Sequence, residues 1–339
     1  MGQGSVIGPL LFLVAVICVS QVLKKAKKIL KERYSIEMTT SHKEYLMDSG
    51  QYQAYTTDNS FADDLTATVC TNNEEQNKIV LNVLQDLYVE YFKNVGLKVN
   101  LDKNEHIVLS TSPRIDKCFM VGDREEKDKV KLLGLTFKAN WKMDAHVNAV
   151  VSKTSYRMAG LARIKDFVDN KTLRRLLDSL VMSIVRYALE FTGITRQNLK
   201  KLQQVQNRAL RLATNSQKDE KISDMLKETR WTSVQNWMRL QQLQTVHLIL
   251  KTKNCSLCST MIEVAKEVDQ NRYNLREKEL KIAWQPVKNR SGANSAFFRM
   301  VKLFNDCGLA TIEIPAGKGA KKSLFKRLIV TRYGLSHKP

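Results

Sequence analysis

The sequence predicts an α+β fold in which strands and helices share the first 150 residues and helices dominate the rest. A β-prone, alternating segment follows the turn Phe61-Ala-Asp-Asp64, and apolar residues recur at helical spacing from Asn77 to Tyr91. Beyond residue 150, apolar stripes of helical period follow one another. With 339 residues, 43% of them hydrophobic, the chain is long enough for two or three domains with cores of their own.

Basic residues are distributed unevenly along the chain. The whole sequence has 55 Lys and Arg against 34 Asp and Glu, a net charge of +21. Residues 151–339 hold 36 of the basic and 15 of the acidic residues, so the first 150 residues are neutral. Such an excess implies a polyanionic partner, either nucleic acid or an acidic membrane surface. The second half of the chain is the expected place of contact.

The N-terminal apolar run from Leu10 to Cys18 has two interpretations. After Gly8 and Pro9 it predicts a short buried helix that continues toward Lys24. A membrane anchor or signal peptide is the alternative, but the run is shorter than the roughly 20 residues of a span and no Lys or Arg precedes it. We expect no membrane association, and six scattered cysteines favour an intracellular protein, nuclear or cytoplasmic.

Further elements are expected in order along the first 150 residues. Residues 34–56 are polar and predict a loop, and the helix around residues 77–91 is expected to pack on the hairpin that turns at Asp63 and Asp64. Strands are expected over Leu97–Ser110 and over Val130–Phe137, the second interrupted by Gly134.

The second half predicts amphipathic helices. One apolar stripe comprises Leu173, Leu176, Leu177, Leu180, Ile184, Tyr187 and Ala188. Arg174, Arg175 and Arg186 lie outside this stripe. Another comprises Leu199, Leu202, Val205, Ala209 and Leu212. Thr232 with Gln235 predicts a capping box that opens a helix through about Leu250.

The two adjacent carboxylates at the predicted hairpin turn are the first chemical signal. Like charges repel and gain nothing there unless a cation lies between them. Two-metal phosphoryl transfer uses such carboxylates to hold Mg²⁺. A solvated Asp-Asp turn is the alternative, and the motifs on either side of the pair decide between the two.

Four motifs occur in a fixed order: Gln3-Gly4-Ser5-Val-Ile-Gly8-Pro9, Phe61-Ala-Asp-Asp64, Leu97-Lys-Val-Asn100-Leu-Asp-Lys103 and Val130-Lys-Leu-Leu-Gly134. Together they resemble the reverse transcriptases of non-LTR (LINE-like) retrotransposons. Weaker likenesses continue through Leu202–Arg211, Trp231–Val234 and Ser323–Lys326, so the resemblance covers nearly the whole chain.

The resemblance implies roles for particular residues. Gln3, Gly4 and Ser5 would line the nucleotide site, because small residues there let a substrate approach the backbone. Asp63 and Asp64 would be catalytic and would bind Mg²⁺ or Mn²⁺. Lys103 would assist the departure of pyrophosphate.

The resemblance also implies a domain order: a partial palm over residues 1–115, a primer-grip-like hairpin over 116–150, a helical thumb over 151–215 and a mainly helical C-terminal region over 216–339. The expected partners are an RNA template and a DNA primer. Thumb contacts to their phosphates are expected from Lys200, Lys201, Arg208 and Arg211.

The sequence also departs from that family. The family's first catalytic carboxylate and its fingers lie upstream of the Gln-Gly-Ser loop, and no residue here can be assigned to them. Thr57–Ser60 is polar where an apolar strand is usual, and Asn104 stands where Thr or Ser often follows the lysine. The expected function is therefore that of a fragment of an RNA-directed DNA polymerase, inactive alone. The alternative is a non-catalytic nucleic-acid-binding protein derived from such an element.

Cys255 and Cys258, with His247 upstream, offer three zinc ligands. No second Cys or His pair follows at the spacing of a zinc finger. Reduced thiols are therefore the expectation for these two cysteines.

Overall fold

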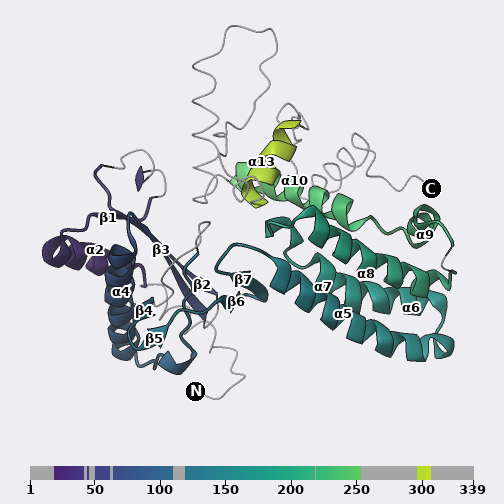
Figure 1. Ribbon diagram of the computed structural model, residues 1–339, viewed down its shortest axis with the longest axis horizontal. Helices are drawn as coiled ribbons and strands as arrows, with labels where there is room; N and C mark the ends of the chain where they lie inside the picture. Colours follow the sequence, from purple (N-terminus) through teal and green to yellow (C-terminus); the bar gives the residue numbers. More distant parts are fainter. Residues whose placement is uncertain are drawn as a thin grey trace, which may run out of the picture. The chain divides into compact units, whose positions relative to one another are not determined.

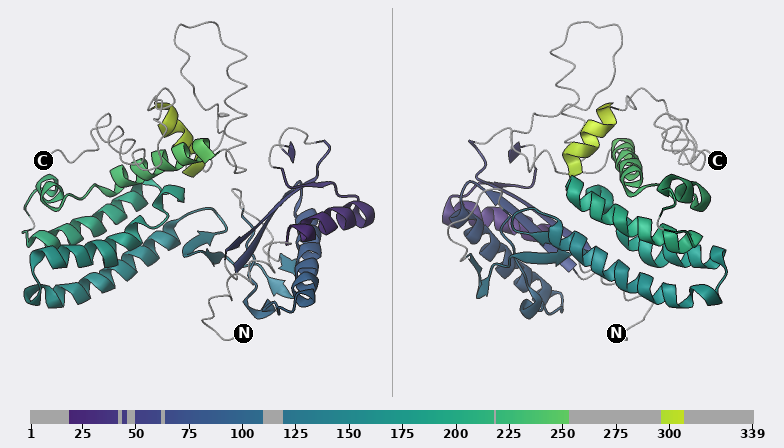
Figure 2. Two further views of the ribbon diagram at one scale, coloured as in Figure 1. Left: turned by 180° about the vertical axis from the view of Figure 1, so that it is seen from behind. Right: turned by 45° about the vertical axis from the view of Figure 1, so that its right-hand side comes forward.

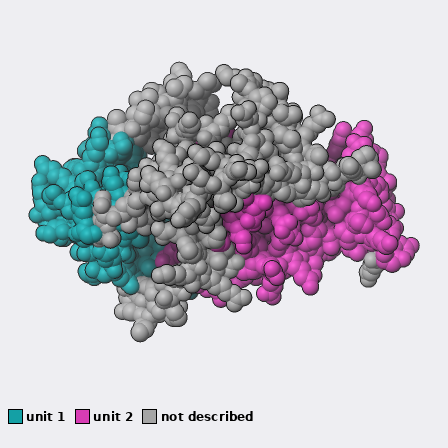
Figure 3. Space-filling model, turned by 90° about the horizontal axis from the view of Figure 1, so that it is seen from above, with its two compact units in different colours: residues 1–108, 114–128 teal, residues 109–113, 129–339 magenta. Residues whose placement is uncertain are grey.

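The computed structural model describes residues 19–41, 44–45, 50–61, 64–109, 119–217, 219–252 and 296–306. The chain divides into two compact units, drawn in teal and magenta in Figure 3. Unit 1 comprises residues 1–108 and 114–128, and unit 2 comprises residues 109–113 and 129–339. Strands and helices mix in unit 1 and helices dominate unit 2, so the α+β class is confirmed.

Unit 1 combines a small sheet with two long helices (Figure 1). Its elements are α2 (Ser20–Tyr34), β1 (Met38–Thr39), β2 (Ala54–Phe61), β3 (Asp64–Thr71), α4 (Glu74–Asn94), the 3-10 turn η1 (Leu101–Lys103), β4 (Met120–Val121) and β5 (Arg124–Glu125). The sheet has the order β1-β2-β3, with β1 parallel and β3 antiparallel to β2.

The segment 34–56 is not only the loop that its polarity predicts. Met38 and Thr39 pair with Ala54 and Tyr55 as the edge strand β1. Ile36 and Met38 bring this about, because both side chains are buried in the core of unit 1.

Helix α4 fixes the position of the sheet. Asn73 caps it by accepting a hydrogen bond from the Gln76 backbone N–H (2.8 Å), and Glu74 and Glu75 favour the positive end of the helix dipole. The helix is longer at both ends than the expected 77–91. Its buried apolar side chains pack with those of α2 and the sheet, and the shared core includes Val22, Ala26, Leu30, Met38, Ala54, Val80, Leu84 and Leu87.

The strand expected over Leu97–Ser110 is wrong for the described residues 97–109. They contain no strand, and their ordered feature is the single turn η1. Leu97, Leu101 and Leu109 are exposed, so the apolar residues that suggested a strand have no core to cover. The Asn100 side chain starts the turn by accepting from the Asp102 backbone N–H at 3.1 Å.

Unit 2 begins with a hairpin and continues as packed helices (Figure 2). Its described elements are β6 (Lys129–Leu132), β7 (Leu135–Lys138), α5 (Asp144–Ile164), the 3-10 turn η2 (Lys165–Phe167), α6 (Asn170–Leu177), the π-helical turn η3 (Asp178–Met182), α7 (Ser183–Arg186), the 3-10 turn η4 (Leu189–Phe191), α8 (Arg196–Thr214), α9 (Ile222–Thr229), α10 (Val234–Thr252) and α13 (Ala296–Asp306). The strand signal at Val130–Phe137 is confirmed by β6 and β7.

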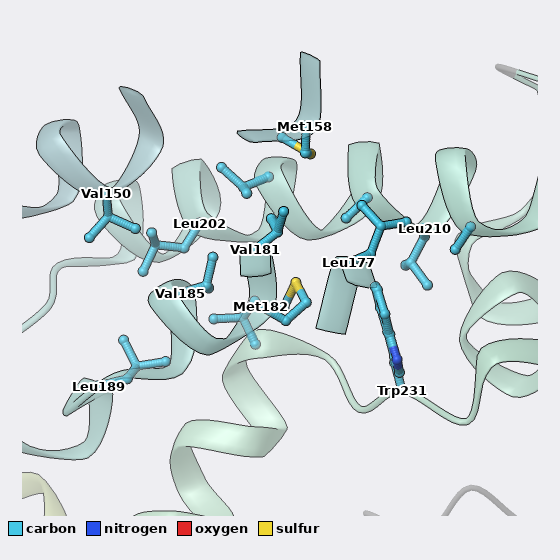
Figure 4. Packing of buried hydrophobic residues seen from close by; sticks show 14 of the residues in the cluster. Val150, Met158, Leu177, Val181, Met182, Val185, Leu189, Leu202, Leu210 and Trp231 are labelled. Carbon is cyan, nitrogen blue, oxygen red and sulfur yellow. The ribbon is translucent and has the colours of Figure 1, made fainter. Parts of the chain in front are cut away.

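The π-helical turn η3 changes which residues face the core of unit 2. Its wider hydrogen-bonding pattern adds a residue to the turn, which shifts the apolar stripe. Leu173 and Leu177 are buried as expected, but Leu180 and Tyr187 are 40% and 53% exposed. Val181, Met182 and Val185 take the core positions, as Figure 4 shows.

Arg186, expected off the stripe, is half-buried and holds unit 2 together. Its guanidinium lies 2.7 Å from the Asp178 carboxylate. The same group lies 6.0 and 5.9 Å from the ring centres of Trp231 and Trp237. Arg186 therefore joins both ends of the segment that contains the π turn to the tryptophans near the start of α10.

The start of α10 is one residue later than the capping box Thr232–Gln235 would place it. The hydroxyl of Ser233, not of Thr232, accepts from the Asn236 backbone N–H (3.3 Å). Gln206 of α8 accounts for this position, because its side chain donates to the Thr232 carbonyl (2.8 Å) and accepts from the Val234 backbone N–H (3.0 Å).

No helix among the described residues is long and apolar enough to cross a bilayer. The apolar run Leu10–Cys18 and the pair Cys255 and Cys258 lie outside the described residues, as does the side chain of His247.

Replacing Leu177 by Ala should lower the free energy of unfolding of unit 2 by about 2–5 kcal/mol, because the side chain is fully buried among Val181, Leu210 and Trp231. The matched control is Leu180→Ala, which should cost less than about 1 kcal/mol because Leu180 is exposed. Urea denaturation followed by tryptophan fluorescence reports on this unit, since all four tryptophans belong to it. Equal losses for the two variants would contradict the π-shifted stripe.

Candidate functional site

The β2–β3 hairpin has two different faces. Its register runs without a break from Ala54↔Thr71 to Phe61↔Asp64, so alternate residues point to opposite sides. The helix-covered face includes Thr56, which is fully buried, and Leu65, Ala67 and Val69, which pack on the core of unit 1. The other face carries mostly polar side chains: Tyr55, Thr57, Asn59, Asp64, Thr66, Thr68 and Cys70.

Asp64 lies on the mostly polar face, at the end next to the turn. It pairs with Phe61, and both residues are exposed, Phe61 by 66%. The register leaves Ala62 and Asp63 as the two residues that connect the strands. A tight acidic hairpin was expected here, and the register confirms it. Asp63 itself lies outside the described residues, as do Gln3, Gly4 and Ser5.

A contact between Tyr88 and Asp58 ties the hairpin to α4, and the sequence did not point to it. The Tyr88 hydroxyl donates to Asp58 Oδ2 at 2.9 Å. Burial first, and then the neighbouring Asp58 carboxylate, raise the pKa of Tyr88, so the hydroxyl stays protonated and remains a donor. Asp58 belongs to the polar stretch Thr57–Ser60, and its carboxylate serves as the acceptor of this hydrogen bond.

Lys103 lies in η1, just beyond α4, and its side chain is exposed. The turn is attached to its surroundings at two points. Asn104 Nδ2 donates to Gln85 Oε1 of α4 (2.8 Å), and Asp102 accepts from Arg124 of β5 (2.8 Å). Lys103 therefore projects from a turn whose backbone is held by unit 1.

The β6–β7 hairpin is held by contacts at its tip and along β7. Gly134 has φ +82°, and a Cβ there would lie 3.2 Å from the Tyr187 ring. The Tyr187 hydroxyl donates to the Leu133 carbonyl at 2.6 Å. On β7, His146 Nδ1 lies 3.5 Å from the backbone nitrogen of Thr136, and burial lowers the pKa of this imidazole. A neutral His146 thus accepts from the hairpin backbone.

The four basic candidates on α8 differ in exposure. Lys200 and Arg208 are exposed, whereas Lys201 and Arg211 are half-buried. The Lys201 ammonium donates to Asn148 Oδ1 of α5 at 3.0 Å, which places this lysine at the seam between the two helices. One turn earlier, Asn198 Nδ2 donates to Asp144 Oδ1 (2.8 Å), so α5 and α8 run in the same direction.

A metal centre with three or more His, Cys, Asp or Glu ligands does not occur among the described residues. Asp64 supplies one exposed carboxylate at the hairpin tip, and Asp58 lies on the opposite face. Mg²⁺ is commonly held by one or two carboxylates plus water and substrate phosphates. The donor set that Asp63 and Asp64 offer by sequence fits such an open ion, but not an enclosed all-protein site.

Searches against protein-family models, curated proteins and solved structures find no match for this chain.

Unit 2 should become less stable in acid through His146. Because burial lowers its folded pKa below the ordinary value of 6.5, the unfolded chain binds the proton more readily. The free energy of unfolding should be unaffected by this residue above about pH 6.5 and should fall as the pH drops from there toward the lowered pKa. Urea titrations from about pH 7.5 to 5 measure it. In a His146→Gln chain that part of the decline should disappear, and an unchanged decline would exclude His146 as its source.

Proposed function

We propose that the chain is a segment of an RNA-directed DNA polymerase of the non-LTR retrotransposon type, with unit 1 as part of its palm. One observation carries the proposal: the two-residue turn Ala62-Asp63, next to the exposed Asp64, closes an antiparallel hairpin whose one face is packed on helices and whose other face is mostly polar. An exposed acidic tip on a rigid support suits a reaction in which ions are held against phosphates.

The turn residues support a functional interpretation. Two-residue hairpin turns are most favourable with Asn-Gly or Asp-Gly, and Ala62-Asp63 is neither. Turn stability alone does not account for two adjacent carboxylates at this point. Binding of a divalent cation does, because it removes their repulsion.

In this proposal the chain's own residues have separable tasks. Asp63 and Asp64 bind the metal, which when present stabilises charge on the transferring phosphate. Tyr88 keeps β2 seated on α4 through Asp58 and so keeps the tip in place. Lys103, exposed on an anchored turn, provides positive charge for the departing pyrophosphate.

Unit 2 supplies the nucleic-acid contacts in this proposal. Helices α5, α6 and α8 together contain eleven Lys and Arg residues and a single acid, Asp144. Side chains such as Lys200 and Arg208 contact the phosphates of template and primer without reading sequence. The role is intracellular, nuclear or cytoplasmic, where such nucleic acids occur.

A non-catalytic nucleic-acid-binding role is the second candidate. It is favoured by the charge of α5, α6 and α8, whose eleven Lys and Arg residues can contact phosphates without any metal site. The two candidates differ in whether the hairpin binds metal.

The hairpin should bind Mn²⁺ through its two carboxylates. In a titration followed by electron paramagnetic resonance, an Asp63→Asn, Asp64→Asn chain should bind Mn²⁺ at least about tenfold more weakly than the wild type, since ligand charge sets the affinity for such ions. Asp58→Asn is the matched control, because residue 58 lies on the helix-covered face and an asparagine oxygen can still accept from Tyr88, and it should bind like the wild type. Equal binding by all three chains would remove the metal role and leave the second candidate.

The basic helices should give nucleic-acid binding a steep salt dependence. For duplex DNA, each phosphate that the protein neutralises adds about 0.9 to the slope of log affinity against log salt. Lys200→Ala, Lys201→Ala and Arg208→Ala together should therefore reduce the slope by roughly 2 to 3. The control is Lys25→Ala with Lys31→Ala, two lysines of unit 1 that pair with Glu90 and Glu37. If the control variant reduced the slope as much as the triple variant does, the thumb assignment would be wrong.

A further inference from the structure

The two most exposed large hydrophobic residues in the described part of the chain lie on α5 and in the 3-10 turn η2 that follows it. Tyr156 and Phe167 are each 84% exposed. Phe167 ends η2, eleven residues beyond Tyr156. An isolated exposed ring needs no explanation, but two such rings this close along the chain call for one.

The residues around Tyr156 are basic, not acidic. Lys153 and Arg163 lie three residues before and seven after it, on the same exposed side of the helix. The acids nearest in sequence stand at the two ends, Asp144 in the first turn of α5 and Asp166 in η2. An electropositive surface with protruding rings complements a polyanion that has flat apolar groups.

Gly160 leaves the backbone of this face open. It lies one turn after Tyr156, and a Cβ built on it would meet nothing within 4 Å. A glycine inside a helix is less stable than alanine, and here packing gives no reason for it. Close approach of a ligand to the helix backbone is a reason, because glycine permits it.

We propose that this face of α5 is a stacking platform for single-stranded nucleic acid. Tyr156 and Phe167 each stack on an unpaired base, and Lys153 and Arg163 contact phosphates of the same strand. Single strands fit and duplexes do not, because base faces inside a duplex are already stacked on one another. The proposal rests on the proposed function only in requiring that the chain bind nucleic acid.

The test pairs a protein change with a ligand change, in the full chain. Fluorescence anisotropy measures the affinity of the wild type and of a Tyr156→Ala, Phe167→Ala chain for two probes. One is a short labelled oligodeoxythymidylate, and the other is an abasic strand with the same number of phosphates. The double substitution should weaken binding of the thymidylate strand about tenfold or more and leave the abasic strand unchanged.

Two controls separate stacking from a general effect of the substitutions. Tyr156→Phe keeps the ring and should bind the thymidylate strand like the wild type. Phe191→Ala removes an exposed ring of unit 2 that lies outside α5, in η4, and should bind both strands like the wild type. Both rings of the platform are exposed, so their removal should leave the thermal unfolding of the chain unchanged.

The possible failures are distinguishable. Equal weakening for both strands means that the rings do not stack on bases and overturns the platform. Unchanged binding of both strands by the double variant also overturns it, while the proposed nucleic-acid function stands. A wild-type chain that binds neither strand nor duplex overturns both proposals.

Discussion

The pairing of β2 with β3 is the constraint on which the rest of the account depends. Eight successive pairs, ending at Phe61↔Asp64, leave only two residues to connect the strands. A slip of β3 by one residue would turn Asp64 toward α4, and a slip of β2 would bring Thr57 and Asn59 into the core. Burial of Ala54 and Thr56 under the helices opposes that slip, so the core of unit 1 and the direction of the acidic tip have one physical origin.

In unit 2, polar side chains stabilise the irregular part of the helical region, where the π-helical turn η3 interrupts the α-helices. The π turn would leave helix segments poorly registered, and Arg186 compensates by joining Asp178 to two tryptophan rings. Arg157 adds to this by donating to the carbonyl of Leu180 within the turn (2.9 Å). These two arginines contact groups within the fold, whereas basic side chains such as Lys200 and Arg208 are exposed and can contact a partner.

The sequence predicted features that depend on local pattern. Alternation around Phe61–Asp64 indicated the hairpin, and helical spacing indicated α4 and α8. The sequence did not predict contacts between residues far apart in the chain. The Tyr88–Asp58 and Tyr187–Leu133 contacts span 30 and 54 residues and have no local signal. The π turn was missed because one extra residue in a helical turn leaves composition unchanged. The pattern of Leu97–Ser110 predicts a strand, but Leu97, Leu101 and Leu109 are exposed and have no core to pack against.

The central proposal is that the carboxylates of Asp63 and Asp64 hold a divalent ion beside the nucleic acid that the chain binds. Fe²⁺ bound at the tip carboxylates in place of Mg²⁺, with ascorbate and peroxide, generates hydroxyl radicals that cut nucleic acid only nearby. On a labelled primer–template, the account predicts cuts confined to the region of the primer 3′ end, and their loss in an Asp63→Asn, Asp64→Asn chain. Cuts spread evenly along the duplex, or unchanged in that variant, would contradict it.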